Sequence, residues 1–433
     1  MSDQKKFILP TYQNLEKEYA DSVRCNRCGF CETVCPTYVV TGKETLSPRG
    51  RTQAFRQILE GKILNPGDAS EVFSTCLTCH ACTNVCFSQV PVGKLMAQAK
   101  AMAASQEKYR WFSALATHIL RFLLSHRAFL TILLWPFFLL KRIGISGFLN
   151  SIGLLNWISP ELSRAEEMLP QSPLSFSIKI PKMDGGKRIN YFSGCGTHYI
   201  YPNIGQACAK VLEKTGFSIN KSSHPCCGLI ANSAADVEGA RRLAKKNIQF
   251  FSGSEDPIFI DDDSCYGFMK GYGDLLGGDK EAVKFSKRVK NLAQLLSETD
   301  LNWGKIDHPK VTVTCHDSCQ IGNAYGETYP PRKVLKSLNW VEFKEMEEST
   351  WCCGGAGSYC IKHPKLSEDI LERKLKNVEA TQAQVVVAGA SSCLMQMQHG
   401  NKKNRNEKLK VLHLAELIAA GFVVQSGLKK PLL

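Results

Sequence analysis

Several common signals are missing from this 433-residue chain, and each absence excludes a class of protein. No G-x-G-x-x-G run occurs, so the chain lacks the fingerprint with which a Rossmann domain binds FAD or NAD. It also lacks a basic–aromatic stripe and any recognisable nucleic-acid module, so no nucleic acid is expected as a partner. The first residues contain no apolar core of a signal peptide, and we therefore expect a cytoplasmic protein.

Acidic residues and long apolar runs are both missing from residues 108–160. The best apolar stretch there, Ala128–Leu140, has 13 residues, whereas a transmembrane helix needs about 20. The segment holds tryptophans and six basic residues, Lys108, Arg110, Arg121, Arg127, Lys141 and Arg142. We expect a basic, apolar helical hairpin that lies peripherally on the inner face of the cytoplasmic membrane. The alternative is a hairpin buried against partner subunits.

Cysteine, by contrast, is abundant, with 19 residues that are mostly clustered. In a chain of this length such clusters predict metal binding in a reducing compartment rather than a disulfide scaffold. The formal charge of +14 counts every cysteine as neutral, so ligated thiolates would lower it. The remaining positive charge suits an acidic partner or anionic lipid.

Two cysteine runs have the same spacing. The first is Cys25-x2-Cys28-x2-Cys31-x3-Cys35, and the second is Cys76-x2-Cys79-x2-Cys82-x3-Cys86. Bacterial two-cluster ferredoxins hold two [4Fe–4S] clusters with this spacing, and the fourth cysteine of each run ligates the other cluster. We therefore predict one cluster on Cys25, Cys28, Cys31 and Cys86, and a second on Cys76, Cys79, Cys82 and Cys35.

Zinc is the alternative for these runs, because paired CxxC motifs also bind zinc. A zinc site needs two pairs or a Cys/His set and has no use for four thiols at these steps, twice over. One departure from the ferredoxin pattern is Phe87, which stands where a second proline corresponding to Pro36 is usual. That proline shapes a turn and is not a ligand, so the cluster prediction stands.

The chain is predicted to be an α+β multidomain protein. Residues 1–107 form a helical two-[4Fe–4S] ferredoxin-like domain, and residues 108–186 form the hairpin and a linker that contains Pro and Gly. Residues 187–305 and 306–433 are two copies of one α/β repeat, because each alternates short apolar strands with helices. This alternation predicts a short parallel sheet in each copy.

Each repeat contains a Cys-Cys-Gly sequence and further cysteines that follow strands, and we call it a CCG repeat. Ligands bind beyond the carboxyl ends of strands in such sheets. The candidate metal ligands are therefore Cys195, Cys226, Cys227 and Cys265 in the first repeat and Cys319, Cys352, Cys353 and Cys393 in the second. Four thiols suit a further iron–sulfur cluster or a zinc ion, and the alternative is buried cysteine in a packed sheet.

The chain resembles the glycolate oxidase iron–sulfur subunit family over nearly its whole length. The motifs that carry the resemblance are Cys28-Gly-Phe-Cys31, Cys35-Pro-Thr-Tyr38, Pro48-Arg-Gly-Arg51, Cys76-Leu-Thr-Cys79 and Cys352-Cys353-Gly-Gly-Ala-Gly. The wider superfamily includes lactate-utilisation proteins, an iron–sulfur subunit of anaerobic glycerol-3-phosphate dehydrogenase and heterodisulfide reductase subunits.

The resemblance implies an electron relay with no catalytic residue in this chain. A partner FAD-containing dehydrogenase subunit would oxidise a 2-hydroxy acid, and the clusters would pass its electrons toward membrane quinone. A rival is an enzyme subunit whose CCG centre reduces a disulfide, as in heterodisulfide reductase. The full motif of that family ends Cys-x-x-Cys, whereas this chain has Asp262 and Ala390 at the first position, so each repeat lacks one thiol. Another rival is a structural adaptor whose repeats only dock the flavoprotein.

Residues near Cys319 offer substitutes for the missing thiol of the second repeat. Cys315 and His316 precede Cys319 by four and three positions, and either side chain is a potential metal ligand.

Overall fold

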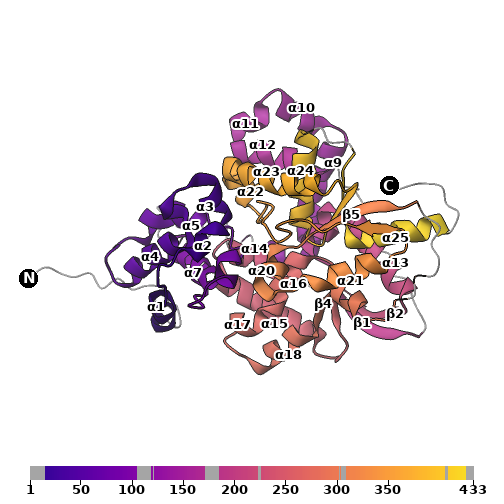
Figure 1. Ribbon diagram of the computed structural model, residues 1–433, viewed down its shortest axis with the longest axis horizontal. Helices are drawn as coiled ribbons and strands as arrows, with labels where there is room; N and C mark the ends of the chain where they lie inside the picture. The colour runs from indigo at the N-terminus through magenta and orange to yellow at the C-terminus, as the bar shows by residue number, and fades with distance from the viewer. Residues whose placement is uncertain are drawn as a thin grey trace, which may run out of the picture. The chain divides into compact units, whose positions relative to one another are not determined.

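The computed structural model describes residues 15–104, 119, 121–170, 185–222, 226–301, 303, 309–404 and 408–425. The chain divides into two compact units, residues 1–108 and 109–433. Unit 1 is helical and unit 2 contains two parallel sheets, so the predicted α+β multidomain class is confirmed (Figure 1). The finer division of unit 2 at residues 186 and 305 stays a prediction.

Unit 1 consists of short helices joined by tight loops. Its elements are α1 (Leu15–Val23), α2 (Phe30–Thr33), α3 (Pro36–Thr41), η1 (Glu44–Leu46), α4 (Pro48–Leu59), η2 (Pro66–Ala69), α5 (Ser70–Ser74), α6 (Ala81–Asn84) and α7 (Val92–Ala104).

Helix α4 starts where the sequence provides both an N-cap and a first-turn proline. The Ser47 hydroxyl accepts the backbone N–H of Gly50 at 2.9 Å, and Pro48 occupies the first turn. Phe55 of this helix packs with Phe73 and Met96 in a small core. The core fixes α4 and α7 against each other and leaves the cysteine loops at its edge.

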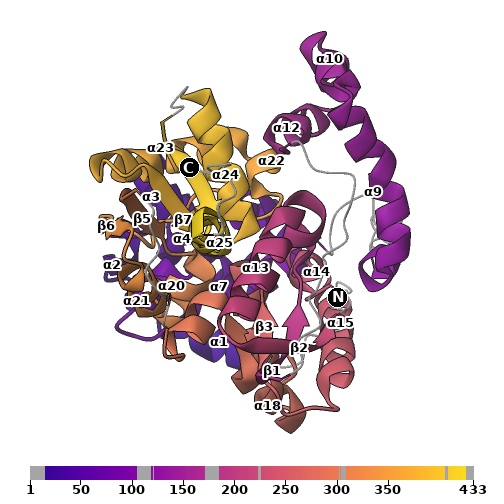
Figure 2. The ribbon, with the colours of Figure 1, turned by 90° about the vertical axis from the view of Figure 1, so that its right-hand side faces the viewer.

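Unit 2 begins with a helical segment that precedes the sheets. Its described helices are α9 (Arg127–Arg142), α10 (Ile145–Ser151), α11 (Leu154–Ile158) and α12 (Pro160–Met168). Figure 2 shows α9 running along the outside of unit 2, with α10 at its far end. Of the six basic residues singled out in the sequence, Lys108 and Arg110 lie outside the described residues.

The first CCG repeat alternates strands and helices. It comprises β1 (Lys187–Phe192), η3 (Gly196–Ile200), α13 (Pro202–Lys214), β2 (Phe217–Ser222), α14 (Leu229–Ser233), α15 (Val237–Phe251), β3 (Ile258–Ile260), α16 (Asp263–Lys270), α17 (Tyr272–Leu275), α18 (Lys280–Arg288), β4 (Val289–Asn291) and α19 (Leu292–Ser297). All its strands are parallel, in the order β2-β1-β3-β4.

The second repeat has the same order of strands. It comprises β5 (Val311–His316), α20 (Cys319–Tyr325), α21 (Tyr329–Ser337), β6 (Val341–Phe343), α22 (Tyr359–Lys362), α23 (Pro364–Ala380), β7 (Val385–Ala388), α24 (Ser391–Lys403), β8 (Lys410–His413) and α25 (Leu414–Gln425). Its parallel sheet has the order β6-β5-β7-β8, so the two predicted parallel sheets are confirmed.

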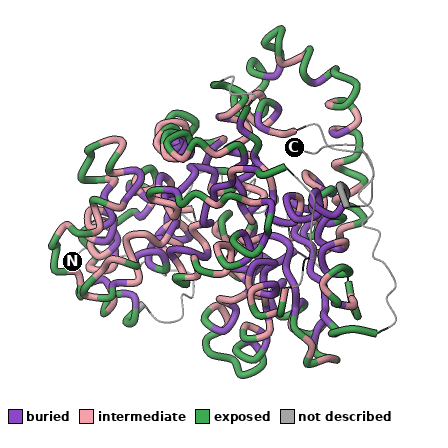
Figure 3. The backbone as a smooth tube through the Cα atoms, turned by 45° about the vertical axis from the view of Figure 1, so that its right-hand side comes forward, coloured by how far each residue is buried: buried purple, intermediate pink, exposed green. Residues whose placement is uncertain are grey.

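The two repeats pack together reciprocally. Helix α13 of the first repeat lies against α25 of the second, and α21 of the second lies against α19 of the first. The loops after β3 and β7 also meet, where Asp263 N–H donates to Gly389 O at 2.9 Å and Ser391 N–H donates to Asp262 Oδ2 at 3.0 Å. Figure 3 shows that the strands of unit 2 are largely buried, and one apolar core spans both repeats.

Candidate metal centres

The two cysteine loops of unit 1 wind in the same way. Two residues after the first cysteine of each run, Arg27 and Thr78 have positive φ angles of 55° and 49°. One residue after the second cysteine, Gly29 and His80 have φ angles of 87° and 60°. Left-handed backbone is costly for residues other than glycine, and its repetition at the same two steps indicates one required loop shape.

A thiol of the first run lies at the second run. Cys35 lines one cavity together with Cys76, Cys79 and Cys82, although it lies far from them in the sequence. Burial, followed by the neighbouring thiols of Cys79, Cys76 and Cys35, raises the pKa of Cys82. Buried thiols this close stay protonated unless a metal supplies positive charge, so the donor set fits a metal cluster.

The other set is arranged around the first loop. Burial and then the thiol of Cys25 raise the pKa of Cys31 to about 12. Asn26 donates to the Ser88 hydroxyl at 3.0 Å, which ties this loop to the segment just after Cys86. The structure thus places Cys25, Cys31 and the Cys86 segment in one neighbourhood, whereas Cys28 is the exposed member of the predicted set.

A buried arginine contacts the second set. Arg51 is 2% exposed, and its Nη1 lies 4.0 Å from the sulfur of Cys35. It donates to the Thr37 and Thr75 hydroxyls at 3.0 and 2.9 Å and to Val72 O at 2.9 Å. In the described part of the chain no carboxylate forms an ion pair with it. Buried charges need a counter-charge, and an anionic thiolate-bound cluster beside Cys35 would provide one.

Arg49, an arginine beside the first loop, is by contrast paired with carboxylates. Arg49 Nε forms ion pairs with Glu32 at 2.5 Å and Glu44 at 2.8 Å. The two predicted clusters therefore have different electrostatic surroundings.

The four candidate thiols of the first CCG repeat form a closed ring of contacts. Cys227 and Cys265 have their sulfurs 3.4 Å apart. Cys195 contacts both Cys226 and Cys265, and Cys226 raises the pKa of Cys195 to about 12. Hydrogen bonds from Cys226 and Cys265 lower the pKa of Cys227 to about 6. Four converging thiols, of which one deprotonates readily, can bind a soft metal.

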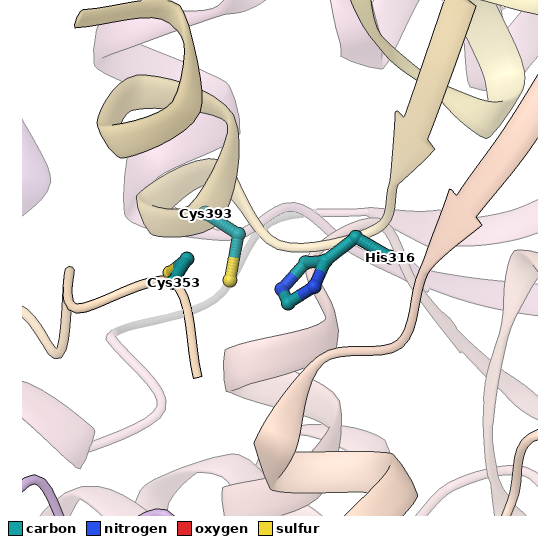
Figure 4. Close-up of side chains that lie close together, drawn as sticks. All are labelled: His316, Cys353 and Cys393. Carbon is teal, nitrogen blue, oxygen red and sulfur yellow. The ribbon is translucent and has the colours of Figure 1, made fainter. Parts of the chain in front are cut away.

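The second repeat gathers its thiols in the same way. Contacts with Cys319 and Cys353 raise the pKa of Cys352, and hydrogen bonds from Cys352 and Cys393 lower that of Cys353. His316 joins this group, because a ring nitrogen and the sulfurs of Cys353 and Cys393 all lie within 4.8 Å of one another. Figure 4 shows the Cys393 sulfur directed into the space between Cys353 and the imidazole ring.

Only one of the two substitutes near Cys319 reaches the thiols. Neighbouring residues in a strand point to opposite faces. His316 therefore turns toward Cys353 and Cys393, and Cys315 is not part of that group of donors. Cys208 and Cys360 are also fully buried.

The residue at the missing-thiol position of the first repeat has another role. Asp262 Oδ1 accepts the N–H of Ser264 at 2.8 Å at the start of α16, and its Oδ2 accepts the N–H of Ser391 in the other repeat. Its carboxylate is thus used in a helix cap and a contact between repeats. The side chain of Ala390, at the corresponding position of the second repeat, has no atom that could bind a metal.

Family models match both parts of the chain that hold the candidate thiols. The model described as "Cysteine-rich domain" (CCG) matches residues 189–270 and 313–398, and the "4Fe-4S dicluster domain" model matches residues 21–90. A protein of Bacillus subtilis named "Probable glycolate oxidase iron-sulfur subunit" is 32% identical, over 94% of this chain and 97% of its own length. This chain belongs to the glycolate oxidase iron–sulfur subunit family.

Other relatives have related names. The "Glycolate oxidase iron-sulfur subunit" of Escherichia coli is 28% identical, over 88% of this chain and 91% of its own length. "Lactate utilization protein A" of Oceanobacillus iheyensis is 27% identical, over 53% of this chain and 96% of its own length. The resemblance inferred from the cysteine motifs is thus confirmed.

Asp261 holds the turn that carries Cys195 in this family member. Its carboxylate accepts the N–H of Gly194 at 2.6 Å and the hydroxyls of Thr197 and Tyr191 at 2.7 Å each. Burial is the main cause that raises its pKa to about 6. A raised acid pKa means that the folded state binds the proton more tightly, so stability is full below the unfolded value and falls as pH rises through 6.

We expect Asp261→Asn, which mimics the protonated acid, to remove this pH dependence. Between about pH 5 and pH 7 the unfolding free energy of the variant should rise by about 1 kcal/mol relative to that of the unsubstituted chain. Anaerobic urea titrations at both pH values measure the difference. Asp300→Asn, which removes an exposed carboxylate, is the control. An equal pH dependence in Asp261→Asn and the unsubstituted chain would contradict the expectation.

Proposed function

We propose that this chain is the iron–sulfur electron-transfer subunit of a 2-hydroxy-acid oxidase or dehydrogenase of the glycolate type. The observation that carries the proposal is the pair of identically wound cysteine loops, together with the delivery of Cys35 to the cavity of the second loop. The names of the full-length relatives support the substrate class. Bound [4Fe–4S] clusters would supply one-electron transfer, which a two-electron flavin needs in order to discharge stepwise.

The proposed ligand sets come from the cysteine spacing, and the place of Cys35 in the cavity of the second run supports them. Cys25, Cys28, Cys31 and Cys86 would hold one cluster, and Cys76, Cys79, Cys82 and Cys35 the other. The CCG cysteines would hold a further iron–sulfur cluster or zinc. The protein's own contribution is to bury the sulfurs, fix the loops and place the charge of Arg51 beside one set only.

The hydroxy acid itself would bind to a partner FAD-containing subunit. That subunit would remove two electrons and two protons from the acid and yield the 2-oxo acid. This chain would accept the electrons singly and pass them toward quinone.

A direct test uses the complex purified anaerobically through a tag on this chain. Addition of glycolate should bleach the visible iron–sulfur absorbance and produce the EPR signals of reduced clusters. Lactate and glycerol 3-phosphate, added separately, report which acid or alcohol the complex accepts. Reduction of the flavin by glycolate with no reduction of the clusters would contradict the proposed electron transfer.

Crossed ligation makes a pairwise prediction. Cys35→Ser should eliminate the same EPR signal as Cys79→Ser, and Cys86→Ser the same signal as Cys28→Ser, because each pair shares one cluster. Each variant should contain up to about four fewer irons per chain. If Cys35→Ser instead matched Cys28→Ser, each run would bind its own cluster and the assignment would be wrong.

Arg51 should raise the reduction potential of the cluster next to Cys35. A buried positive charge favours the more negative, reduced cluster. We expect Arg51→Gln to lower that potential by roughly 60–130 mV, which corresponds to the 1.5–3 kcal/mol of a charged hydrogen bond. EPR-monitored redox titration measures it. Arg49→Gln is the control, because Glu32 and Glu44 already balance Arg49. An unchanged potential in Arg51→Gln would show that the charge has no such effect.

The helical segment is our candidate for membrane contact. Among the described residues no single helix is long and apolar enough to cross a membrane, although α9 and α10 together, bent by 69°, meet that length and composition. Many apolar side chains of the segment are exposed, including Ile132, Phe148 and Trp157, at 69%, 64% and 83%. Such an exposed apolar surface suits a lipid interface or a partner subunit.

Most of the described basic residues of this segment form ion pairs or hydrogen bonds within the chain. Arg121 forms an ion pair with Asp236, and Lys141 pairs with Glu166 at 2.8 Å. Arg127 donates to Ser193 O at 2.7 Å, whereas Arg142 is exposed. We therefore propose that the chain lies peripherally on the inner face of the cytoplasmic membrane through apolar contacts more than through charge.

The combined variant Ile132→Ser, Phe148→Ser and Trp157→Ser should bind anionic phospholipid vesicles at least roughly tenfold more weakly, because each lost apolar contact costs more than about 1 kcal/mol. Co-sedimentation measures the binding. The control replaces exposed residues elsewhere, Leu64→Ser, Val283→Ser and Tyr329→Ser. Undiminished vesicle binding together with loss of the flavoprotein from the variant would assign the surface to the partner subunit instead.

A further inference from the structure

We propose that His316 is a metal ligand, and that the second CCG repeat therefore holds a centre with mixed imidazole and thiolate ligation while the first is all-thiolate. This inference rests on the proposal that the second repeat binds a metal. It goes further by adding a residue of a different chemical type and by making the two repeats unequal.

The imidazole and two thiols of the second repeat are placed as ligands of one ion would be. A ring nitrogen of His316 and the sulfurs of Cys353 and Cys393 lie mutually within 4.8 Å, and all three side chains are buried. Two ligand atoms on one tetrahedral ion lie roughly 3.5–3.8 Å apart, given metal–sulfur and metal–nitrogen bonds of about 2.3 and 2.0 Å. Small side-chain rotations would therefore bring the three atoms onto a single ion. Cys319 and Cys352 contact the same group and supply further donors.

The imidazole is also buried, and it faces thiols rather than ordinary hydrogen-bond partners. His316 is 2% exposed, and within the described part of the chain neither of its ring nitrogens has a hydrogen-bond partner of normal geometry. The Cys353 thiol lies close to the imidazole ring. A buried polar group without a good partner is costly, and native structures seldom keep one without a reason. A metal shared with the thiolate would supply that reason.

The first repeat provides an internal comparison. Phe192 ends β1 three residues before Cys195, just as His316 ends β5 three residues before Cys319. Phe192 is fully buried in an apolar cluster beside Cys226, Cys227 and Cys265. An apolar ring thus fills this strand position without difficulty, so packing alone does not require the histidine of the second repeat.

The donor set restricts the metal. Imidazole and thiolate together suit borderline and soft ions, either the iron of a cluster or zinc. An imidazole ligand is neutral, whereas a thiolate is anionic, and replacement of thiolates by histidine raises the potential of iron–sulfur centres. If iron is bound, the centre of the second repeat would accept an electron more readily than a comparable all-thiolate centre in the first.

The test compares three forms of the full chain purified anaerobically, the unsubstituted protein, His316→Phe and His316→Cys. Iron, acid-labile sulfide and zinc are counted per chain, and pulsed EPR or X-ray absorption reports nitrogen bound to the metal. The eight predicted cluster ligands of unit 1 are all thiols, so a nitrogen signal would arise from unit 2. Phenylalanine is the residue that the first repeat uses at this position. Circular dichroism and thermal unfolding check that each variant folds.

The unsubstituted chain should contain nitrogen-ligated metal. His316→Phe should lose this metal, and His316→Cys should keep it without the nitrogen signal. Loss of iron and sulfide in His316→Phe would identify a cluster, and loss of about one zinc a mononuclear site. The control His126→Gln, which changes an exposed histidine, should keep both the metal and the nitrogen signal.

Two outcomes would overturn the inference. If the unsubstituted chain held metal in the second repeat but showed no nitrogen ligand, and His316→Phe kept that metal, His316 would not be a ligand. If no metal were found beyond two unit-1 clusters, the inference would also fail, while the electron-transfer function proposed for unit 1 would stand.

Discussion

The gathering of buried thiols determines most of what this protein can do. Sulfurs from distant parts of the sequence converge at each candidate centre, and burial among neighbouring thiols raises the pKa of groups such as Cys31 and Cys82. A cluster of thiols is a poor hydrophobic core, because aliphatic side chains would pack there more favourably. It becomes favourable when a metal supplies the positive charge that deprotonates the thiols. The loops of unit 1 and the strand ends of unit 2 both serve this requirement.

Each unit contains two similar copies of one structural element, and the copies differ at single residues near the thiols. In unit 1 the two loops share their left-handed positions, yet a buried arginine that no described carboxylate neutralises stands beside only one of the sets. In unit 2 the sheets have the same strand order, yet His316 in one corresponds to Phe192 in the other. The difference in reduction potential between two centres sets the free energy of electron transfer between them. Single charged or neutral side chains next to otherwise similar thiol sets are a simple means to produce such differences.

The helical segment is the part of unit 2 that bears on where the protein lies. Arg121 and Arg127 contact the rest of unit 2 and attach the segment to it, whereas Lys141 pairs with Glu166 inside the segment. Its exposed apolar side chains remain for an external partner. The segment therefore divides between an inward, polar attachment and an outward, apolar surface, which is the arrangement that a peripheral membrane contact or a stable subunit interface requires.

The sequence by itself determined the class of protein, because cysteine spacing is local. The runs that begin at Cys25 and Cys76 predict clusters before any fold is known, and alternating strands and helices predict two parallel sheets. Tertiary structure decided which thiols meet. Cys35, which precedes α3, lines the cavity of the second run, and His316 rather than Cys315 lies with Cys353 because neighbouring residues of β5 face opposite ways. It also decided that Arg121 and Lys141 are paired within the chain, since their partners Asp236 and Glu166 lie far away in sequence.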